Sequence, residues 1–348
     1  MKPLASYLLF GFKHERFIEQ ALEGAVAQDY EPMEIIVSDD GSPDGTAAVI
    51  EGFLARYTGP KTIRFRKNAV NLGLATTFSN AVEDSAGAVI VGAAGDDVPR
   101  PDRVATLMRL FADETVTCAF SNADVIDEHG AVQRAHYKGQ PARTSLWDYA
   151  NPYSGVLGAT AAYRRSIFTA FGPLAADLIY EDRVLPVRAA ITGKIVYSDE
   201  RLVFYRRHDA NVWNGIMLQF ERRADWQRYE VKVTRDTIAV VRSRIRDIDT
   251  GIALVPHRAH ELRRLRQDLS RSLHRLEVQR TMFESGAVRR IPVAIGHVLS
   301  GAAGGPRRIW GFVKKNFLTD RHFRDLRAAR AAREDRLRKG GPVNPPCV

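Results

Sequence analysis

The first 94 residues alternate between short apolar runs and longer segments with helical periodicity. Strand-like runs occupy residues 4–10, 33–38, 62–67 and 88–94, and helix-like segments occupy residues 15–28, 46–57 and 74–86. Strands and helices that alternate in this way form a parallel sheet, because each parallel strand needs a crossover connection before the next one. The alternation therefore predicts an α/β fold.

The second strand-like run ends at two adjacent carboxylates, Asp39 and Asp40, and a loop of Gly41, Ser42 and Pro43 follows. Open α/β sheets bind their ligands at the carboxyl ends of the strands. A carboxylate pair at this place could accept hydrogen bonds from a nucleotide base or a ribose.

A calcium loop and a plain turn are two other interpretations of the same stretch. The spacing of a helix-loop-helix calcium site is met by Asp40, Ser42, Asp44, Gly45 and Glu51. We reject that site because the incoming segment is strand-like and Pro43 lies inside the loop. A turn in which Thr46 caps the next helix remains an alternative for this segment taken alone.

A second strand-like run ends in the same way. Residues 86–95 are small and apolar, and Asp96 and Asp97 follow directly. A helix cap explains this second carboxylate pair poorly, because Pro99 and Pro101 come immediately afterwards.

Together the two carboxylate pairs resemble glycosyltransferase family 2, the inverting sugar transferases of GT-A fold. Two more segments resemble the family: residues 11–18 are similar to its first nucleotide loop, and Asn71-Leu72-Gly73 with Asn80 to its asparagine-glycine segment. The resemblance covers roughly residues 3–210 and implies a Rossmann-like central sheet and a nucleotide-sugar donor. The nucleotide-binding residues that it implies are Phe12, Glu15, Asp39, Asp40, Asn71 and Asp96.

The second carboxylate pair corresponds to the family's DXD motif, which carries a divalent metal. The usual Asp-Ala-Asp-Asp is here Ala94-Gly95-Asp96-Asp97, so the first acid is absent. Because the family uses the last acid most directly, the resemblance implies Asp97 as the first metal ligand, with Asp96 beside it. Oxygen ligands suit Mn²⁺ or Mg²⁺, and such a cation neutralises the charge that develops on a diphosphate leaving group.

A third carboxylate pair, Glu181 and Asp182, precedes a helix-like segment at residues 184–192. Inverting transfer needs a base that removes the proton of the acceptor hydroxyl, and a carboxylate can do so. By resemblance to the family's Glu-Asp motif, Asp182 is the base and Glu181 supports it. A salt-bridged pair with Arg183 or Arg188 at a helix start is the structural alternative.

A strand-like piece at residues 194–197 is followed by the segment at residues 202–208, whose last four residues, Tyr205-Arg206-Arg207-His208, resemble the family's C-terminal element. It implies that His208 contacts the metal or the diphosphate and that the arginines face phosphate oxygens. A lone histidine is more often structural. Two weaker candidates open the first helix: His14 and Glu15 could line the nucleoside site, although a first-turn acid is also ordinary capping.

Charge divides the chain more sharply than composition does. Residues 1–215 hold 22 Lys plus Arg against 27 Asp plus Glu, and the remaining residues hold 29 against 14. We therefore expect a catalytic domain at residues 1–215 and a basic helical extension at residues 216–348. The two cysteines, Cys118 and Cys347, lie far apart, so neither a structural disulfide nor a cysteine zinc site is expected.

The extension contains two segments that suit contacts with other surfaces. An amphipathic stripe for packing on the catalytic domain or on a second copy of the chain is formed by Leu262, Leu265, Leu269, Leu273 and Leu276. Residues 291–313 are too interrupted to span a bilayer. A membrane interface is suited by Ile309, Trp310, Phe312 and Val313 beside Arg307, Arg308, Lys314 and Lys315.

Three classes of function follow from these features. The first is a metal-dependent inverting glycosyltransferase that moves a sugar, by default from UDP, to a glycan or lipid-linked acceptor in cell-surface polysaccharide or glycolipid synthesis. Without a recognisable signal peptide we expect it in the cytoplasm, peripheral on the inner face of a membrane. The second is a non-catalytic nucleotide-sugar or carbohydrate binding module, which the absent acid at Ala94 supports. The third is a nucleic-acid binder, but the basic tail lacks a recognition motif and interleaved aromatic residues, so no specific nucleic acid is expected.

Overall fold

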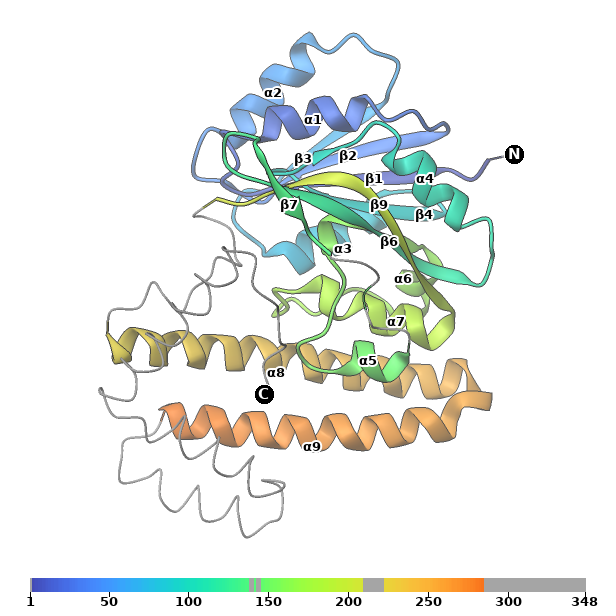
Figure 1. Ribbon diagram of the computed structural model, residues 1–348, viewed down its shortest axis with the longest axis vertical. Helices are drawn as coiled ribbons and strands as arrows, with labels where there is room; N and C mark the ends of the chain where they lie inside the picture. The colour runs from blue at the N-terminus through green and yellow to red at the C-terminus, as the bar shows by residue number, and fades with distance from the viewer. Residues whose placement is uncertain (1, 138–140, 142–144, 209–221, 285–348) are drawn as a thin grey trace. The chain divides into compact units, whose positions relative to one another are not determined.

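The computed structural model describes residues 2–137, 141, 145–208 and 222–284 and divides the chain into two compact units. The first unit comprises Met1–His208 together with Ala239–Ser270, and the second comprises Asp209–Ile238 together with Arg271–Val348. The first unit contains the central sheet and every carboxylate pair named above (Figure 1).

A mixed sheet in the order β3-β2-β1-β4-β8-β6-β9-β5 forms the centre of the first unit, and β7 pairs with β6 at one side. The strands are β1 (Ala5–Gly11), β2 (Met33–Asp39), β3 (Ile63–Lys67), β4 (Val89–Ala94), β5 (Val98–Pro99), β6 (Val116–Ile126), β7 (Val132–Ala135), β8 (Ala161–Arg164) and β9 (Lys194–Arg206). Strands β1 to β4 are parallel to one another, as the alternating sequence pattern predicts. Strand β8 is antiparallel to both β4 and β6, so the second half of the sheet departs from the simple crossover pattern.

The predicted strand-like piece at 194–197 is the beginning of strand β9, which continues to Arg206 through the apolar residues that start at Leu202. The polar residues that separate the two apolar parts of β9 lie at a bulge. Ser121 of β6 pairs with Ser198 of β9, whereas the next residue of β6, Asn122, pairs with Arg201. The Asn122 side chain donates a 3.1 Å hydrogen bond to Asp199 within this bulge. The polar residues in the middle of β9 therefore mark an irregular pairing register and not the end of a strand.

Helices cover both faces of the sheet. The described residues form helices α1 (Ile18–Val26), α2 (Thr46–Arg56), α3 (Leu74–Asp84), α4 (Arg103–Leu110), α5 (Leu146–Ala150), α6 (Ser166–Phe171), α7 (Leu185–Thr192), α8 (Arg223–Leu254) and α9 (Ala259–Glu284). Helices α1, α2 and α4 lie on one face, and α3 and α6 lie on the other (Figure 1). Short 3₁₀ turns in the described part of the chain are η1 (Gly158–Thr160), η2 (Glu181–Arg183) and η4 (Pro256–Arg258).

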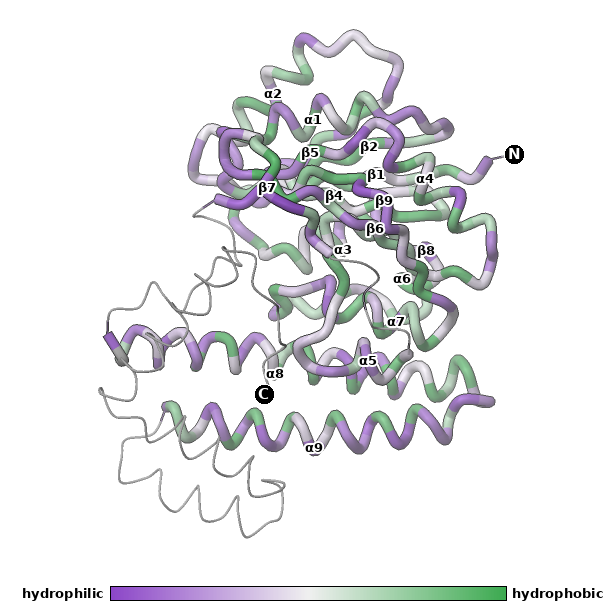
Figure 2. The backbone as a smooth tube through the Cα atoms, in the orientation of Figure 1, coloured by the Kyte–Doolittle hydropathy of each residue, from purple (hydrophilic) through white to green (hydrophobic). Residues whose placement is uncertain are grey.

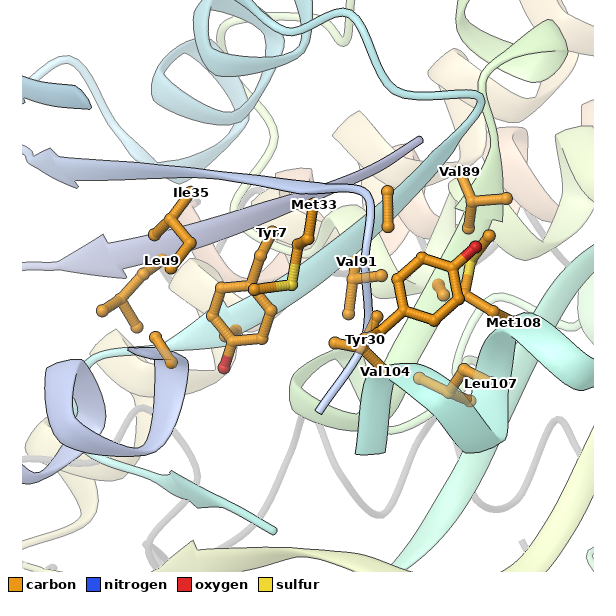
Figure 3. Packing of buried hydrophobic residues seen from close by; sticks show 14 of the residues in the cluster. Tyr7, Leu9, Tyr30, Met33, Ile35, Val89, Val91, Val104, Leu107 and Met108 are labelled. Carbon is orange, nitrogen blue, oxygen red and sulfur yellow. The ribbon is translucent and has the colours of Figure 1, made fainter. Parts of the chain in front are cut away.

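Alternate residues of the parallel strands build the core beneath α1 and α4. Tyr7, Leu9 and Val91 are completely buried and pack with Val104 and Leu107 of α4 (Figure 3). Side chains of period two along a strand fill one face, and the helices supply the opposite wall. This core fixes the positions of the strand ends that carry the acids.

The predicted leucine stripe is on helix α9, whose apolar residues recur along its length (Figure 2). Leu262, Leu265, Leu269 and Leu276 are buried, and Leu273 is half-buried. No helix among the described residues is both long and apolar enough to cross a membrane. The proposed interface cluster around Trp310 lies outside the described residues, as does the rest of the chain beyond residue 284.

Candidate active site

The carboxyl ends of β2, β1 and β4 lie side by side and gather the first two carboxylate pairs. In the register of the sheet, Gly11 of β1 lies opposite Asp39 of β2, and Phe10 lies opposite Ala94 of β4. Asp40 is the residue directly after β2, and only Gly95 separates Asp96 from the end of β4. The sheet therefore brings residues far apart in sequence to one edge, as the strand-end argument predicts.

Asp40 is occupied by the protein itself. One carboxylate oxygen accepts hydrogen bonds from Asn68 Nδ2 at 2.8 Å, from the Leu72 N–H at 2.9 Å and from the Thr77 hydroxyl at 2.7 Å. The other oxygen accepts the Gly73 N–H at 2.9 Å. Asp40 thus ties the end of β2 to the loop that enters α3.

Asp39 differs from its neighbour. Its Oδ2 accepts the Ser42 N–H at 3.1 Å, whereas its Oδ1 is buried and has no hydrogen-bond partner among the described residues. We call a carboxylate oxygen in this state an open acceptor: it is buried, and no described residue donates to it. Because burial without a partner is costly, an open acceptor is a natural place for a donor group of a ligand.

The first nucleotide loop is fastened to the loop after β2. Glu15 accepts the Gly45 N–H at 3.0 Å, and the His14 N–H donates to the Thr46 hydroxyl at 2.9 Å. Asn71 donates from its side chain to the Asp40 carbonyl at 3.2 Å. Glu15 and Asn71 thus shape the loops of the nucleoside edge, and half-buried Phe12 lies in the same loop as Glu15.

The second carboxylate pair has one open acceptor as well. Asp97 Oδ1 accepts the Arg206 N–H at 2.8 Å, and the buried Asp97 Oδ2 has no partner within the described part of the chain. Burial and the charge of Asp96 raise the pKa of Asp97 well above its ordinary value. A cation bound at this oxygen would remove the cost of burying the charge.

Asp96 lies between two histidines. His208 Nε2 lies 3.1 Å from Asp96 Oδ2, and His14 Nε2 lies 3.7 Å from the same oxygen. Burial raises the pKa of Asp96, but the hydrogen bond from His208 and the charges of both histidines outweigh it and lower that pKa overall. The structure therefore brings the predicted residues Asp96, Asp97 and His208 together and adds His14 to them.

Arg206 holds the turn of this carboxylate pair from behind. Its guanidinium donates to the Asp96 carbonyl at 2.9 Å and to Gln20 Oε1 at 2.6 Å, and the residue is buried. The pairing of β5 with β9 brings it there, since Val98 lies opposite Phe204. The expectation that Arg206 faces phosphate oxygens is therefore wrong for its guanidinium, which is committed to the protein, whereas Arg207 is exposed.

Gly95 allows this turn to lie close to the first loop. A Cβ at Gly95 would come within 2.6 Å of Ile18 Cδ1 and within 2.9 Å of both His14 Nδ1 and the Phe10 carbonyl. The Gly95 N–H also donates to the Phe10 carbonyl at 2.7 Å. A side chain here would push the carboxylate pair away from His14.

The third carboxylate pair lies on the turn η2, packed against residues 155–158. The Val156 N–H donates to the Asp182 carbonyl at 3.2 Å, and the Gly158 N–H donates to the Asp182 carboxylate. Asp182 Oδ1 is a third open acceptor, since it is buried and no described residue donates to it. A Cβ at Gly155 would lie 2.7 Å from the Asp182 carbonyl oxygen, so this approach requires a glycine.

Burial sets the protonation of this third pair. It raises the pKa of Asp182 to about 6, although Arg183, the Gly158 N–H and Arg244 act in the opposite direction. Burial and the charge of Asp182 raise the pKa of Glu181 to about 8. Of the two acids, Asp182 has the lower pKa, and its charge makes ionisation of Glu181 harder, a division that suits a base beside a neutral acid.

Sequence reasoning missed two residues of this region. Burial raises the pKa of Tyr205 above its ordinary value, and the charges of Asp97, Asp96 and Asp182 raise it further. Arg103, the first residue of α4, is buried near Asp97 and donates to the Gly92 carbonyl at 2.6 Å. Tyr205 stood in a segment already singled out, but residue type alone does not reveal a buried arginine.

The donor atoms at the second carboxylate pair fit a hard cation in part. Among the described residues, no three His, Cys, Asp or Glu side chains are grouped so that they could hold a metal ion by themselves. The open acceptor of Asp97, with the Asp96 carboxylate beside it, nevertheless offers the one or two protein carboxylates that Mg²⁺ commonly takes together with substrate phosphates.

Comparison with known proteins agrees with this architecture. Residues 12–172 match the family model described as "Glycosyl transferase family 2". The uncharacterized protein Mb1547 of Mycobacterium bovis is 27% identical over 226 residues, which are 64% of this chain and 63% of that protein. The uncharacterized glycosyltransferase alr2836 of Nostoc sp. is 26% identical over 59% of this chain and 65% of its own length.

Among solved structures, the mannosyltransferase PcManGT from Pyrobaculum calidifontis, in complex with GDP-Man and Mn²⁺, aligns with a TM-score of 0.52. It is 15% identical, and the alignment covers 91% of this chain and 87% of that one. At this identity the likeness concerns the fold, which is the GT-A arrangement.

Proposed function

Since this chain belongs to glycosyltransferase family 2 through residues 12–172, we propose that it transfers a sugar from a nucleoside-diphosphate sugar to an acceptor hydroxyl with inversion. The observation that carries the proposal is that each of the three carboxylate pairs has one open acceptor, on Asp39, Asp97 and Asp182. In this proposal Asp39 recognises the nucleotide base and Asp97 belongs to the diphosphate site. Asp182 is the general base that takes the proton of the acceptor.

The donor would lie across the ends of β1, β2 and β4. Asp39 Oδ1 accepts a hydrogen bond from the nucleotide base, and the loops fastened by Asp40, Glu15 and Asn71 shape the edge around it. Phe12 supplies a half-buried ring in the first of these loops. Preformed loops of this kind bind a ligand more tightly, because no free energy is lost in ordering them on binding.

Asp97 and Asp96 would hold Mn²⁺ or Mg²⁺ against the diphosphate, with His208 adjoining through its contact with Asp96. When bound, such a cation stabilises the negative charge that develops on the leaving diphosphate. The PcManGT complex contains Mn²⁺, and the oxygen donors of this site are of the type that this cation prefers. Arg206 keeps the two carboxylates in place from the protein side.

Asp182 would act as the general base. The acceptor hydroxyl loses its proton to Asp182, its oxygen forms the new bond to the anomeric carbon, and the bond from that carbon to the diphosphate oxygen breaks. A pKa of about 6 leaves Asp182 ionised at neutral pH and still basic enough to take a proton in the transition state. Protonated Glu181 supports it by adding no second negative charge at neutral pH.

We take UDP as the default nucleotide, with GDP as the alternative suggested by the PcManGT complex. The proposed acceptor is a glycan or lipid-linked sugar of cell-surface polysaccharide or glycolipid synthesis, at the inner face of a membrane. The matched relatives extend beyond the shared region, because the alignment spans 63% of the mycobacterial protein.

A non-catalytic binding module is the second candidate, because Ala94 stands where the family usually has the first acid of its motif. Such a module binds a nucleotide sugar or a carbohydrate without reaction, whereas a transferase turns the nucleotide sugar over. The experiment is therefore to incubate the chain with UDP- and GDP-sugars, with and without Mn²⁺, and to measure release of the nucleoside diphosphate.

We expect Mn²⁺-dependent release from one donor and its loss in Asp97→Asn. The asparagine keeps an oxygen to accept the Arg206 N–H, so the turn is preserved while the charge is removed. Calorimetric titration of the same donor should show that Mn²⁺ strengthens binding to the parent chain and not to Asp97→Asn. Binding without any turnover would favour the binding module, and unchanged Mn²⁺-stimulated affinity in Asp97→Asn would remove Asp97 from the site.

A further inference from the structure

Helix α8 carries a fully buried arginine, Arg244, that the proposed reaction does not use directly. Its guanidinium donates only to backbone carbonyls in the hydrogen bonds that the described residues show. Nε donates to the Arg183 carbonyl at 2.8 Å, Nη1 to those of Ala150 and Asn151 at 3.0 and 2.7 Å, and Nη2 to that of Ser154 at 2.8 Å. A second hydrogen bond joins Nη2 to Arg183.

These carbonyls belong to the two segments that meet at Asp182. Arg183 is the last residue of the turn η2 that bears Asp182, and residues 150–154 lead directly into the glycine segment that packs against it. Val156 of that segment donates its N–H to the Asp182 carbonyl. Arg244 therefore holds both sides of the same contact from the interior of the unit.

Attachment of the helix does not require Arg244. Arg188 of α7 forms a buried 2.9 Å ion pair with Asp247, one turn further along α8. Arg258, after α8, donates to the Ala190 and Ile191 carbonyls at 2.7 and 2.9 Å. Two other anchors thus fix this part of the helices to α7, whereas the Arg244 contacts reach the turn of Asp182 and residues 150–154, which lead to the segment packed against that turn.

A buried guanidinium is a costly way to fill space. Burial lowers the pKa of Arg244 to about 9, which shows how poorly this interior solvates the charge. Apolar residues of similar volume often stabilise a protein more than a buried charged group does. What an apolar residue cannot do is to join four carbonyl groups of two segments in one planar fork.

We propose that Arg244 is a positioning residue for the general base: from α8 it fixes the turn that carries Asp182 and places a positive charge behind that carboxylate. The proposal rests on the function proposed above for Asp182. It assigns residues 239–254, beyond the region matched by the family model, a part in the same catalytic site.

Several charged and titratable groups face Asp182, and Arg244 acts among them. They are Glu181 and Arg183 on the same turn, Tyr163 on β8, Tyr205 on β9 and Arg244 on α8. Arg183 and Arg244 are the cations of this group, and both lower the pKa of Asp182. Removing the charge of Arg244 should therefore raise that pKa.

The test compares Arg244→Met, Arg244→Lys and the control Arg246→Met. Met removes the fork and the charge, Lys keeps the charge and loses the fork, and exposed Arg246 lies on the same helix. We expect Arg244→Met to lower kcat by about 10- to 100-fold, as small displacements of a catalytic group do, with donor affinity by calorimetry within about twofold of the parent value. Its acidic limb of kcat against pH should move to higher pH, whereas Arg244→Lys should lower kcat and leave the limb in place.

A readout without turnover separates this proposal from the proposed function. Carbon-13 NMR titration of aspartate carboxyl groups, with Asp182→Asn to identify the Asp182 signal, should show its midpoint raised in Arg244→Met and unchanged in Arg246→Met. If the parent chain turns over no donor, the proposed function fails while this titration still tests the position of Arg244.

Parental kcat and an unmoved pH limb in Arg244→Met would overturn the proposal. Loss of donor affinity in step with kcat would also overturn it, because that is the result of general damage to the fold. Thermal unfolding of each variant accompanies the kinetics. If Arg244→Met does not fold, Arg244→Lys decides alone, and parental kcat in that variant would refute the role of the fork.

Discussion

In the first two carboxylate pairs, the two neighbouring side chains differ in their hydrogen bonds. Asp40 is saturated by four donors, while Asp39 keeps an open acceptor. Asp96 contacts His208, while the open acceptor of its pair belongs to Asp97. An adjacent pair thus provides one acid that builds the site and one that is available to a ligand.

The clearest consequence at the residue scale concerns Asp182. If it accepts the proton of the acceptor hydroxyl, Asp182→Asn should keep donor affinity near the parent value and lower transfer by ~10² or more. A base must be ionised, and the pKa of Asp182 is about 6, so the parent rate should rise with pH through about 6 and then level off. Donor titration and log kcat against pH test these expectations together.

Glu181→Gln is the matched control for that experiment. Glu181 has a pKa of about 8 and is already protonated at neutral pH, so the amide replaces a neutral group. We expect much of the parent transfer rate in Glu181→Gln and an acidic limb that is still present. Near-normal transfer by Asp182→Asn with a loss in Glu181→Gln would assign the base to Glu181 instead.

The sequence predicts that these acids belong to the site, but not which oxygen of each lacks a donor among the described residues. Asp39 and Asp97 can be recognised by their positions in the motifs. Which oxygen of each is the open acceptor depends on tertiary structure, because Ser42 and Arg206 donate to the other oxygen. The roles of Arg206 and Arg244 were hidden for the same reason. The sequence does not show whether an arginine is exposed to solvent or is buried and hydrogen-bonded to backbone carbonyls, because that depends on tertiary contacts.

At the scale of elements, close approach of the β4 end to the first loop depends on Gly95. A methyl group there would meet Ile18, His14 and the Phe10 carbonyl at 2.6 to 2.9 Å, closer than packed atoms come. We expect Gly95→Ala to lose about 1–3 kcal/mol of stability by overpacking and to weaken Mn²⁺-dependent donor binding, because the turn of Asp96 and Asp97 must move. Urea unfolding and donor titration measure the two effects.

Gly92→Ala is the control within the same strand. A Cβ at Gly92 would meet Phe78 at 3.6 Å and two carbonyls at 3.9 Å, which are ordinary contacts. Its stability and donor affinity should remain close to those of the parent. Equal behaviour of the two alanine variants would show that the closeness at Gly95 does not shape the site.

The elements that sequence reasoning found are those with long periodic patterns. Strands β1 to β4 and helices α1 to α3 were expected near their observed positions, because each buries a regular apolar face. The antiparallel insertion of β8 and the two-residue strand β5 were not expected. Strands of four and two residues carry too little pattern, and their pairing is decided by partners far away in sequence.

At the scale of the whole molecule, the division by charge and the division by contacts differ. Residues 1–284 hold 37 Lys plus Arg against 37 Asp plus Glu, and residues 285–348 hold 14 against 4. The net charge of +10 is thus carried entirely by residues beyond α9. Residues 239–270 belong to the first unit. The domain boundary expected after residue 215 therefore stays a prediction, and a chain cut there would lose part of the first unit.

This difference decides how a membrane role of the basic tail should be tested. A chain ending near residue 214 would lack Arg244 and Asp247 and would therefore damage the site together with the tail. A chain ending at Glu284 keeps α8, α9 and the balanced charge, and removes only the residues that carry the excess. It separates attachment from catalysis.

We expect the full chain to bind vesicles of anionic lipid at low salt and the chain ending at Glu284 to bind them far less. Each well-placed Lys or Arg contributes about 1 kcal/mol near an anionic surface, so several acting together give stable attachment. Raising the salt concentration shortens the Debye length and should release the full chain, whereas a dimer held by the leucines of α9 would be insensitive to salt. Co-sedimentation with anionic and with neutral vesicles measures binding, and donor turnover by the shortened chain verifies that its site is intact. If both chains bind anionic vesicles equally, or neither binds at low salt, the tail does not hold this protein at a membrane.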